Sequence, residues 1–273
     1  MITDFHTHAF PDSLAERAIQ TLEAETDGVK ARLDGRVSSL LASMDRAGIR
    51  RAVICSIATR PEQFDPILKW SSQVATDRIV PFPSIHPRDP QARERVRRIR
   101  EAGFLGLKMH PYYQDFYLDE EALFPLYEEI AAQQLIFVCH TGFDIAFPRI
   151  RRCDPVRISR VLSQVPGLPF VATHLGAWED WAEVRRHLLG RPIHMEISFS
   201  LEMLSRGEAR DLLLRHPAEH LLFGTDSPWQ DQPEALARFR ALGLDAERER
   251  AILETNADRL LAASAAAGRP GSA

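Results

Sequence analysis

The stretch Phe104–His140, FLGLKMHPYYQDFYLDEEALFPLYEEIAAQQLIFVCH, contains the pattern that decides the fold. Two short apolar runs, 104–109 and 135–140, flank a segment, 119–133, with the length and periodicity of an amphipathic helix. Strands joined by a helix-length connection run parallel, whereas a short turn is enough to join an antiparallel pair. This stretch therefore predicts one strand–helix–strand unit of a parallel sheet.

The same alternation of short apolar runs and longer amphipathic segments continues along the whole chain. Eight strands are expected at residues 2–7, 51–57, 79–85, 104–109, 135–140, 168–174, 192–198 and 220–225. Helices are expected between them at residues 38–48, 62–76, 89–102, 119–133, 155–165, 178–189, 201–215 and 231–242. Eight such units match a closed (β/α)8 TIM barrel of the α/β class better than an open doubly wound sheet. No G-x-G-x-x-G motif follows a strand, which also disfavours a dinucleotide-binding fold.

The barrel is expected to form a single domain over residues 1–262. The alanine-, glycine- and serine-rich segment 263–273 offers little to bury, so it is expected to be a flexible tail. Residues 9–37 are long for a connection between a strand and the next helix, which predicts an extra helix overhanging the carboxyl ends of the strands.

Composition narrows the class of partner. The 34 Lys and Arg residues against 38 Asp and Glu residues give a net charge of -4, so no strong positive field attracts nucleic acid or an anionic membrane. No apolar run approaches the roughly 20 residues of a membrane span, and the N-terminus lacks the basic region of a signal peptide. These features predict a cytoplasmic protein, monomeric or homodimeric, that acts on a small molecule. The three cysteines form no C-x-x-C pair and are expected to be reduced.

Polar residues stand at the carboxyl ends of five of the expected strands. Because these ends converge at one mouth of a barrel, their side chains are expected to meet there. They are His6 and His8 of the first strand, Lys108 and His110 of the fourth, His140 of the fifth, His174 of the sixth and Asp226 of the eighth. Side chains alternate along a strand, so Asp4 is expected to share one face with His6 and His8, where it could orient an imidazole. The joint set of nitrogen and oxygen donors suits Zn2+ with one position open to water.

The order His-x-His, Lys, His, His, Asp along a barrel resembles the pattern of the amidohydrolase superfamily. The chain is most similar to the amidohydrolase-related branch, which also holds metal-dependent decarboxylases of the aminocarboxymuconate semialdehyde type. The resemblance covers nearly the whole chain. It rests on the segments Asp4–His8 (DFHTH), Gly106–Pro111 (GLKMHP), Phe223–Asp226 (FGTD) and Asn256–Leu261 (NADRLL).

The resemblance implies a role for each residue of the site. His6, His8, His140 and Asp226 would bind a single divalent metal, with zinc as the expected ion. His174 would lie beside the metal, where it polarises the substrate or completes a second metal site. Asp226 would be both a metal ligand and a general base.

Lys108 leaves the number of metal ions open. In superfamily members with two metals, the lysine of the fourth strand is carboxylated and bridges the ions, whereas the Lys-x-His-Pro form found here resembles the branch with one metal and a free lysine. A single ion is the favoured interpretation, with Lys108 as a cation that holds a substrate carboxylate or a developing oxyanion. The alternative is a lysine that extends to solvent at the rim of the barrel.

Substrate contacts are expected from the loops at the mouth of the barrel. The candidates are Lys108, His110, Tyr112, Arg149 and Trp229. Arg149 belongs to a loop with three arginines, which could bind an anionic substrate or form a solvated basic surface. Glu196 of the seventh strand could reach the barrel interior, but it is given no catalytic role.

The predicted function is zinc-dependent hydrolysis of an amide, ester or lactone bond in a small molecule, with or without a carboxylate. A bound divalent cation lowers the pKa of its water towards about 7, and Asp226 would accept the proton and pass it to the leaving group. The first alternative is a nonoxidative decarboxylase, a lyase that uses the same ligands. The second is a catalytically silent metal-binding barrel. The metal ligands alone do not separate these three functions.

Overall fold

The computed structural model describes residues 1–26 and 28–268, and its strands form a closed barrel. The strands are β1 (Thr3–Thr7), β2 (Arg51–Cys55), β3 (Ile79–Phe82), β4 (Gly106–Met109), β5 (Ile136–Cys139), β6 (Phe170–Ala172), β7 (His194–Glu196) and β8 (Leu221–Leu222). Neighbours in this order pair in parallel within two ladders, β1 to β3 and β4 to β8. Parallel bridges between Ser84 and Lys108 and between Thr7 and Ser227 join the ladders at both seams. The predicted (β/α)8 barrel is confirmed.

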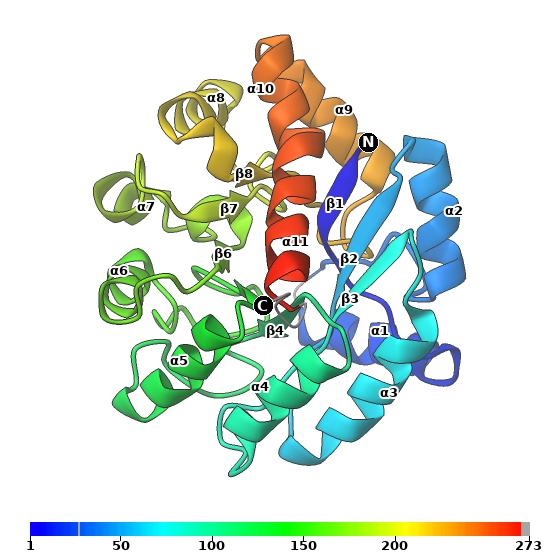
Figure 1. Ribbon diagram of the computed structural model, residues 1–273. Coiled ribbons are helices and arrows are strands. Elements are labelled where there is room, and N and C mark those ends of the chain that lie inside the picture. Colours follow the sequence, from blue (N-terminus) through cyan, green and yellow to red (C-terminus); the bar gives the residue numbers. More distant parts are fainter. Residues whose placement is uncertain (27, 269–273) are drawn as a thin grey trace.

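Helices follow the strands and surround them (Figure 1). They are α1 (Asp12–Glu25), α2 (Val37–Ala47), α3 (Phe64–Val74), α4 (Ala92–Glu101), α5 (Phe124–Ala132), α6 (Pro155–Gln164), α7 (Trp181–His187), α8 (Arg206–Arg215), α9 (Gln232–Ala241), α10 (Ala246–Arg250) and α11 (Asn256–Ala267). Short helical turns are η1 (Pro61–Gln63), η2 (Glu121–Leu123), η3 (His174–Gly176), η4 (Ala218–His220) and the π-helical turn η5 (Ala251–Thr255). Each of the eight connecting helices expected from the sequence is present, while α10 and α11 were not predicted.

Helix α1 is the extra helix expected between the first strand and α2. It ends at Glu25, whose carboxylate lies near Tyr113 in the loop after β4. Since that loop leaves the carboxyl end of its strand, α1 reaches the mouth of the barrel. The helix therefore covers part of the region in which the site residues were expected.

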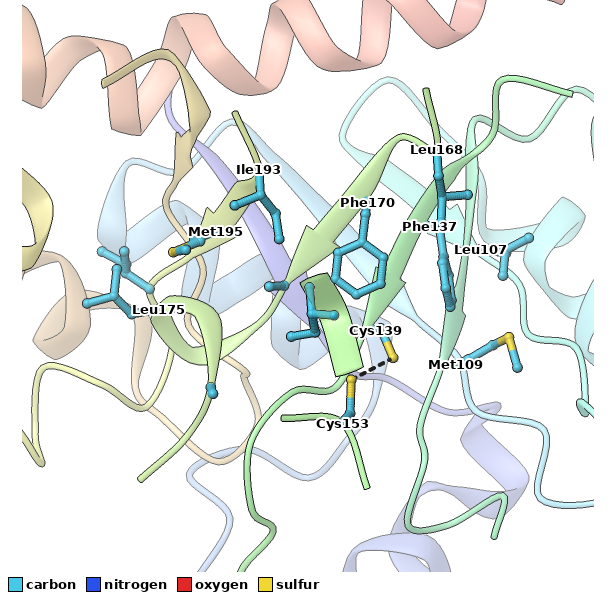
Figure 2. Packing of buried hydrophobic residues seen from close by; sticks show 14 of the residues in the cluster. Leu107, Met109, Phe137, Cys139, Cys153, Leu168, Phe170, Leu175, Ile193 and Met195 are labelled. Carbon is cyan, nitrogen blue, oxygen red and sulfur yellow. Dashed lines mark hydrogen bonds between the residues drawn. The ribbon is translucent and has the colours of Figure 1, made fainter. Parts of the chain in front are cut away.

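Two apolar layers stabilise the barrel. The larger layer lies between the strands and the surrounding helices, and Figure 2 shows part of it, including Leu107, Met109, Phe137, Phe170 and Met195. The smaller layer fills the barrel interior with residues from alternate strand positions and from α11: Phe5, Val53, Phe82, Val138, Val171, Leu222, Ala257 and Leu260. Because strand side chains alternate, a residue such as Lys108 faces inward between the outward-facing Leu107 and Met109.

Helix α11 closes the amino-terminal end of the barrel. The Asn256 amide donates to the carbonyl oxygens of Ala218 and Leu221 at 2.7 and 2.8 Å, and Arg51 at the start of β2 pairs with Asp258 at 2.9 Å. In Figure 1 this helix crosses in front of the strands. The opposite end, where the strands finish, is left for the site.

Residues 263–267 of the segment expected to be a flexible tail are helical instead, because α11 continues through Ala267. Ser264 is buried, and its hydroxyl contacts the carbonyl oxygen of Leu105 at 2.8 Å and the Arg100 guanidinium at 3.1 Å. These contacts hold residues 263–267 against the barrel. Residues 269–273 of the expected tail lie outside the described residues.

The three cysteines are unpaired, as expected from the sequence. Cys55, Cys139 and Cys153 are buried free thiols, and the sulfur atoms of Cys139 and Cys153 are 3.8 Å apart (Figure 2). Within the part of the chain that the structure describes, no helix combines the length and apolar character needed to cross a membrane.

Candidate metal centre

A bulge in β1 brings both histidines of the His-x-His pair to the mouth of the barrel. Between Asp4 and Thr7, β1 has one residue more than its partner strand β2. As a result, Phe5 fills the barrel interior, while His6 and His8 both lie beside the last strand at the mouth. Both histidines of the His-x-His pair therefore reach the mouth because β1 is bulged here, and not because β1 is a regular strand.

Asp4 does not act on the His6 imidazole, so this prediction is wrong. Its carboxylate accepts hydrogen bonds from the backbone N–H and the hydroxyl of Thr225, at 3.0 and 2.6 Å, and from Gln232 Nε2 at 2.8 Å. Burial raises the pKa of Asp4 to about 7, against these hydrogen bonds, which lower it. The bulge turns Asp4 away from the site, and its carboxylate fastens β1 to the segment that follows β8.

His8 and Asp226 each direct a hydrogen-bond acceptor towards the other. His8 Nδ1 lies 2.7 Å from the carbonyl oxygen of Cys55, which can only accept, so the ring proton is on Nδ1. The Nε2 lone pair then points at Asp226 Oδ1, 3.0 Å away, and this buried oxygen has no hydrogen-bond donor among the described residues. Burial would raise the pKa of Asp226, but the positive charges that His6, His8 and His174 carry when protonated lower it below its usual range, and a bound cation would act in the same direction. A carboxylate and a lone pair at this distance suit a shared cation.

His140 and His174 form a second pair of the same kind. His140 Nε2 donates to the carbonyl oxygen of Phe143 at 2.9 Å, and His174 Nδ1 donates to the carbonyl oxygen of Ser198 at 3.1 Å. The remaining nitrogens, Nδ1 of His140 and Nε2 of His174, are 3.1 Å apart. Burial, with the neighbouring His110 and His174, lowers the pKa of His140, so the ring is neutral. When both rings are neutral, two lone pairs meet here, where a cation would be bound.

Lys108 is fully buried and lies beside His6. Its Nζ is 3.0 Å from His6 Nε2. The alternative in which Lys108 extends to solvent at the rim is therefore wrong. Burial and the Lys108 ammonium lower the pKa of His6, which keeps this imidazole neutral as a metal ligand must be.

The donor set fits a divalent metal ion. Neutral imidazole nitrogens and one carboxylate oxygen are ligands that zinc and neighbouring transition metals accept. His6, His174 and Asp226 each place a ligand atom within 4.8 Å of the other two. His174 and Asp226 also have left-handed backbone φ values of 56° and 58°, a strain that proteins retain mainly at functional sites.

A second cluster of possible ligands, His110, His140 and Asp144, lies next to this centre. The rings of His110 and His140 stack with centroids 4.1 Å apart, and their Nε2 atoms lie 3.4 and 3.5 Å from Asp144 Oδ2. His140 uses Nε2 as a hydrogen-bond donor to Phe143, which leaves only its Nδ1 free as a ligand. His140 can therefore reach the first centre only through Nδ1, which lies 3.1 Å from His174 Nε2.

The residues expected to contact substrate differ in whether their polar groups already have partners in the structure. The Tyr112 hydroxyl is buried, and its single proton is shared between the carbonyl oxygens of Gly142 and Ile150, 2.9 and 2.6 Å away. Arg149 pairs with Glu179 and stacks on the Phe143 ring. By contrast, His110 Nδ1 is buried and has no partner among the described residues. Trp229 lies three residues after Asp226, and its backbone N–H donates to the carbonyl oxygen of Asp226 at 3.0 Å.

Glu196 is the residue of the site that the sequence analysis underrated. It is fully buried at the end of β7, and its carboxylate lies 2.8 Å from His6 Nδ1. Its signal in the sequence was the same as that of the ligands, a polar residue that ends an apolar strand. Glu196 takes the position beside His6 that had been expected for Asp4.

Comparison with known proteins agrees with this architecture. The amidohydrolase family model Amidohydro_2 matches residues 3–262. No curated protein matches the sequence significantly. A TIM-barrel protein of uncharacterised function from Bordetella bronchiseptica is similar in structure, with a TM-score of 0.76 and 21% identity over 97% of this chain and 99% of that one.

Two other similar structures carry names that refer to reactions. One is a variant of a 5-carboxyvanillate decarboxylase from Novosphingobium aromaticivorans with bound manganese and a nitrobenzoic acid, with a TM-score of 0.71 and 15% identity over 96% of this chain and 97% of that one. The other is a proposed 2-pyrone-4,6-dicarboxylic acid hydrolase from Pseudomonas putida, with a TM-score of 0.68 and 18% identity over 96% and 97% of the two chains. At such identities the similarity shows the fold. The family match over nearly the whole chain, together with the strand-end ligand pattern, shows that the chain belongs to the amidohydrolase family.

Proposed function

We propose that this chain is a metal-dependent nonoxidative decarboxylase of a small aromatic or unsaturated carboxylic acid. The observation that carries the proposal is the fully buried Lys108, whose Nζ lies 3.0 Å from His6 Nε2. A substrate carboxylate that approaches the ligands would meet this fixed positive charge. The name of the manganese-containing relative supports the same class of reaction.

His6, His8, His140, His174 and Asp226 would hold the metal. A divalent ion would supply a Lewis acid that polarises a substrate oxygen. Zinc remains the expected ion, and manganese is the second candidate because its preference for oxygen and imidazole donors also suits this set. One ion per chain is proposed, with Lys108 as a free cation and not as a carboxylated bridge.

In this proposal the chain's own residues bind the acid and move one proton. Lys108 would hold the anionic group of the acid beside the metal ligands. The carbon–carbon bond to the carboxylate breaks, carbon dioxide leaves, and the electron pair stays on the substrate carbon. Asp226 would pass a proton taken up from water to that carbon, so that R–COO⁻ and H⁺ become R–H and CO₂.

The second candidate is hydrolysis of an amide, ester or lactone. The contact of 3.0 Å between Asp226 Oδ1 and His8 Nε2 favours it, because a carboxylate at the ligands is placed to accept a proton from a nucleophilic water. The proposed lactone hydrolase from Pseudomonas putida is consistent with this second candidate. A barrel that binds metal without turnover is the third candidate.

The experiment that separates these candidates uses isotopically labelled water. The purified protein, loaded with zinc or with manganese, is incubated with a panel of aromatic and unsaturated acids, lactones, esters and amides. A decarboxylation carried out in D₂O yields carbon dioxide and a product with deuterium on carbon. Incorporation of oxygen from ¹⁸O-labelled water into the product, without loss of carbon dioxide, would support the hydrolase and contradict the decarboxylase.

A further inference from the structure

Glu196 collects four hydrogen-bond donors on one buried carboxylate. Its Oε1 lies 2.8 Å from His6 Nδ1, 3.0 Å from the backbone N of His174 and 2.8 Å from the hydroxyl of Ser198. Its Oε2 accepts the backbone N–H of Ser198 at 2.8 Å. The carboxylate therefore contacts two different histidines, which come from β1 and from the end of β6.

These four donors require a side chain at position 196 whose two terminal atoms both accept hydrogen bonds. The two backbone N–H groups can only donate, so neither oxygen of Glu196 can be replaced by a donor without a clash of hydrogens. His6 must then carry its proton on Nδ1, which leaves the Nε2 lone pair facing the centre. The Ser198 hydroxyl, which donates to Glu196, is left as an acceptor 3.0 Å from His174 Nδ1.

The same carboxylate secures the turn that carries His174. His174 and Leu175 have left-handed φ values of 56° and 54°, a conformation that costs free energy for residues other than glycine. The bond from the His174 N–H to Glu196 holds the first residue of this turn. Loss of the carboxylate would free both the ring of His6 and the backbone of His174.

Gly224 makes the room that this carboxylate needs. A Cβ atom at position 224 would lie 2.2 Å from Glu196 Oε2 and 3.1 Å from the Cβ of His6. The backbone of Gly224 is not in the left-handed region, so glycine is required here for space and not for conformation. A methyl group at this position would push Glu196 away from its donors while leaving the carboxylate in the chain.

We propose that Glu196 is a positioning residue of this centre, which holds His6 with its proton on Nδ1 and fixes the turn of His174, in a space that Gly224 provides. The inference rests on the proposed metal-dependent function for what the two histidines bind. The arrangement of donors around the carboxylate does not depend on the reaction. The proposal predicts that removing the Glu196 carboxylate and displacing it both weaken metal binding.

The first test measures metal affinity by competition with a chelator, with Zn2+ alone and Mn2+ alone as probes. Glu196→Gln and Gly224→Ala are both expected to weaken binding by about 10- to 100-fold, the usual effect of losing a partner of a ligating histidine. The matched control is Glu129→Gln, which alters another buried carboxylate, one paired with Arg97 on the outside of the barrel, and is expected to leave metal affinity unchanged. Wild-type affinity in folded Glu196→Gln or folded Gly224→Ala would overturn the proposal.

The second test needs no variant to fold and no metal to bind. In metal-free wild-type protein labelled with ¹⁵N on histidine, NMR is expected to show the His6 proton on Nδ1 and protected from exchange. A His6 proton on Nε2 would overturn the proposal. This readout involves neither metal nor substrate. A chain that is inactive or fails to bind metal would therefore refute the proposed function, while the role of Glu196 would still be tested by the position of the His6 proton.

Discussion

His140 Nδ1 lies 3.1 Å from His174 Nε2, and the other nitrogen of each ring donates to a backbone carbonyl oxygen. When both rings are neutral, neither atom of this contact carries a proton, so the pair offers two lone pairs and no donor. A divalent cation would turn the repulsion into coordination. The contact between His8 and Asp226 has the same character, and the account of the site depends on these two relationships.

The first prediction separates the metal centre from its neighbouring cluster. His140→Ala removes a lone pair of the centre and is expected to weaken metal binding by more than about tenfold, measured by chelator competition. The control is His110→Ala, which removes the stacked ring but no ligand and should retain the metal. Equal loss of metal in the two variants would mean that His110, His140 and Asp144 form the actual centre.

The second prediction concerns Lys108. Lys108→Met keeps much of the length of the side chain and removes its charge, so kcat/KM should fall by about 10²- to 10³-fold, the usual cost of losing a group that stabilises developing charge. With a single metal ion, the variant should still bind as much metal as the wild type in elemental analysis. A decrease from two ions per chain to one would show that Lys108 is a carboxylated bridge.

The third prediction tests closure of the barrel by α11. Asn256→Ala removes a buried amide that bonds two carbonyl oxygens, so the free energy of unfolding should fall by about 1–3 kcal/mol in urea titrations. Thr255→Ala alters the exposed preceding residue and should cost much less. If both variants unfold at the same urea concentration as the wild type, the helix contributes little to closing the barrel.

The fourth prediction gives a pH dependence of stability that comes from the amino-terminal end of the barrel. Burial, and then the charges of His220 and Arg259, lower the pKa of His194 from 6.5 to about 3. Below pH 6.5 the unfolded chain binds a proton at this ring and the folded protein does not, so this contribution to stability is present above pH 6.5 and is lost between 6.5 and about 3. The loss is at most about 1.4 kcal/mol per pH unit.

Urea unfolding of the wild type and of His194→Gln at several values in this pH range checks the prediction. The variant should lose less stability on acidification than the wild type does. Its pH dependence will not vanish, because burial also lowers the pKa of His216 and of His220. An unchanged pH dependence in the variant would show that His194 does not contribute.

The meeting of the candidate ligands at one end of the barrel could be predicted from the sequence, because a parallel barrel leaves little choice in where its strands end. His140, His174 and Asp226 each follow an apolar run, and closure of the sheet brings these ends together whatever the details of the loops. The positions of the strands and of their connecting helices followed from the same periodicity. These features depend on local patterns, which one sequence contains.

Features that depend on the register between strands, or on distant partners, could not be predicted. The bulge in β1 is set by pairing with β2, and it turned Asp4 away from the site. Glu196 meets His6 across 190 positions of the chain. Arg149 was expected to bind substrate because its loop is basic, but the structure pairs it with Glu179, a residue of another loop. The tertiary fold decides which residue a charged side chain pairs with.

The most direct test of the central claim is elemental analysis of the native protein, purified without chelators and without a histidine tag. The account predicts about one zinc-like divalent ion per chain, restored after removal by adding Zn2+ or Mn2+. Protein that is folded but metal-free, and that takes up neither ion when it is supplied, would contradict the account.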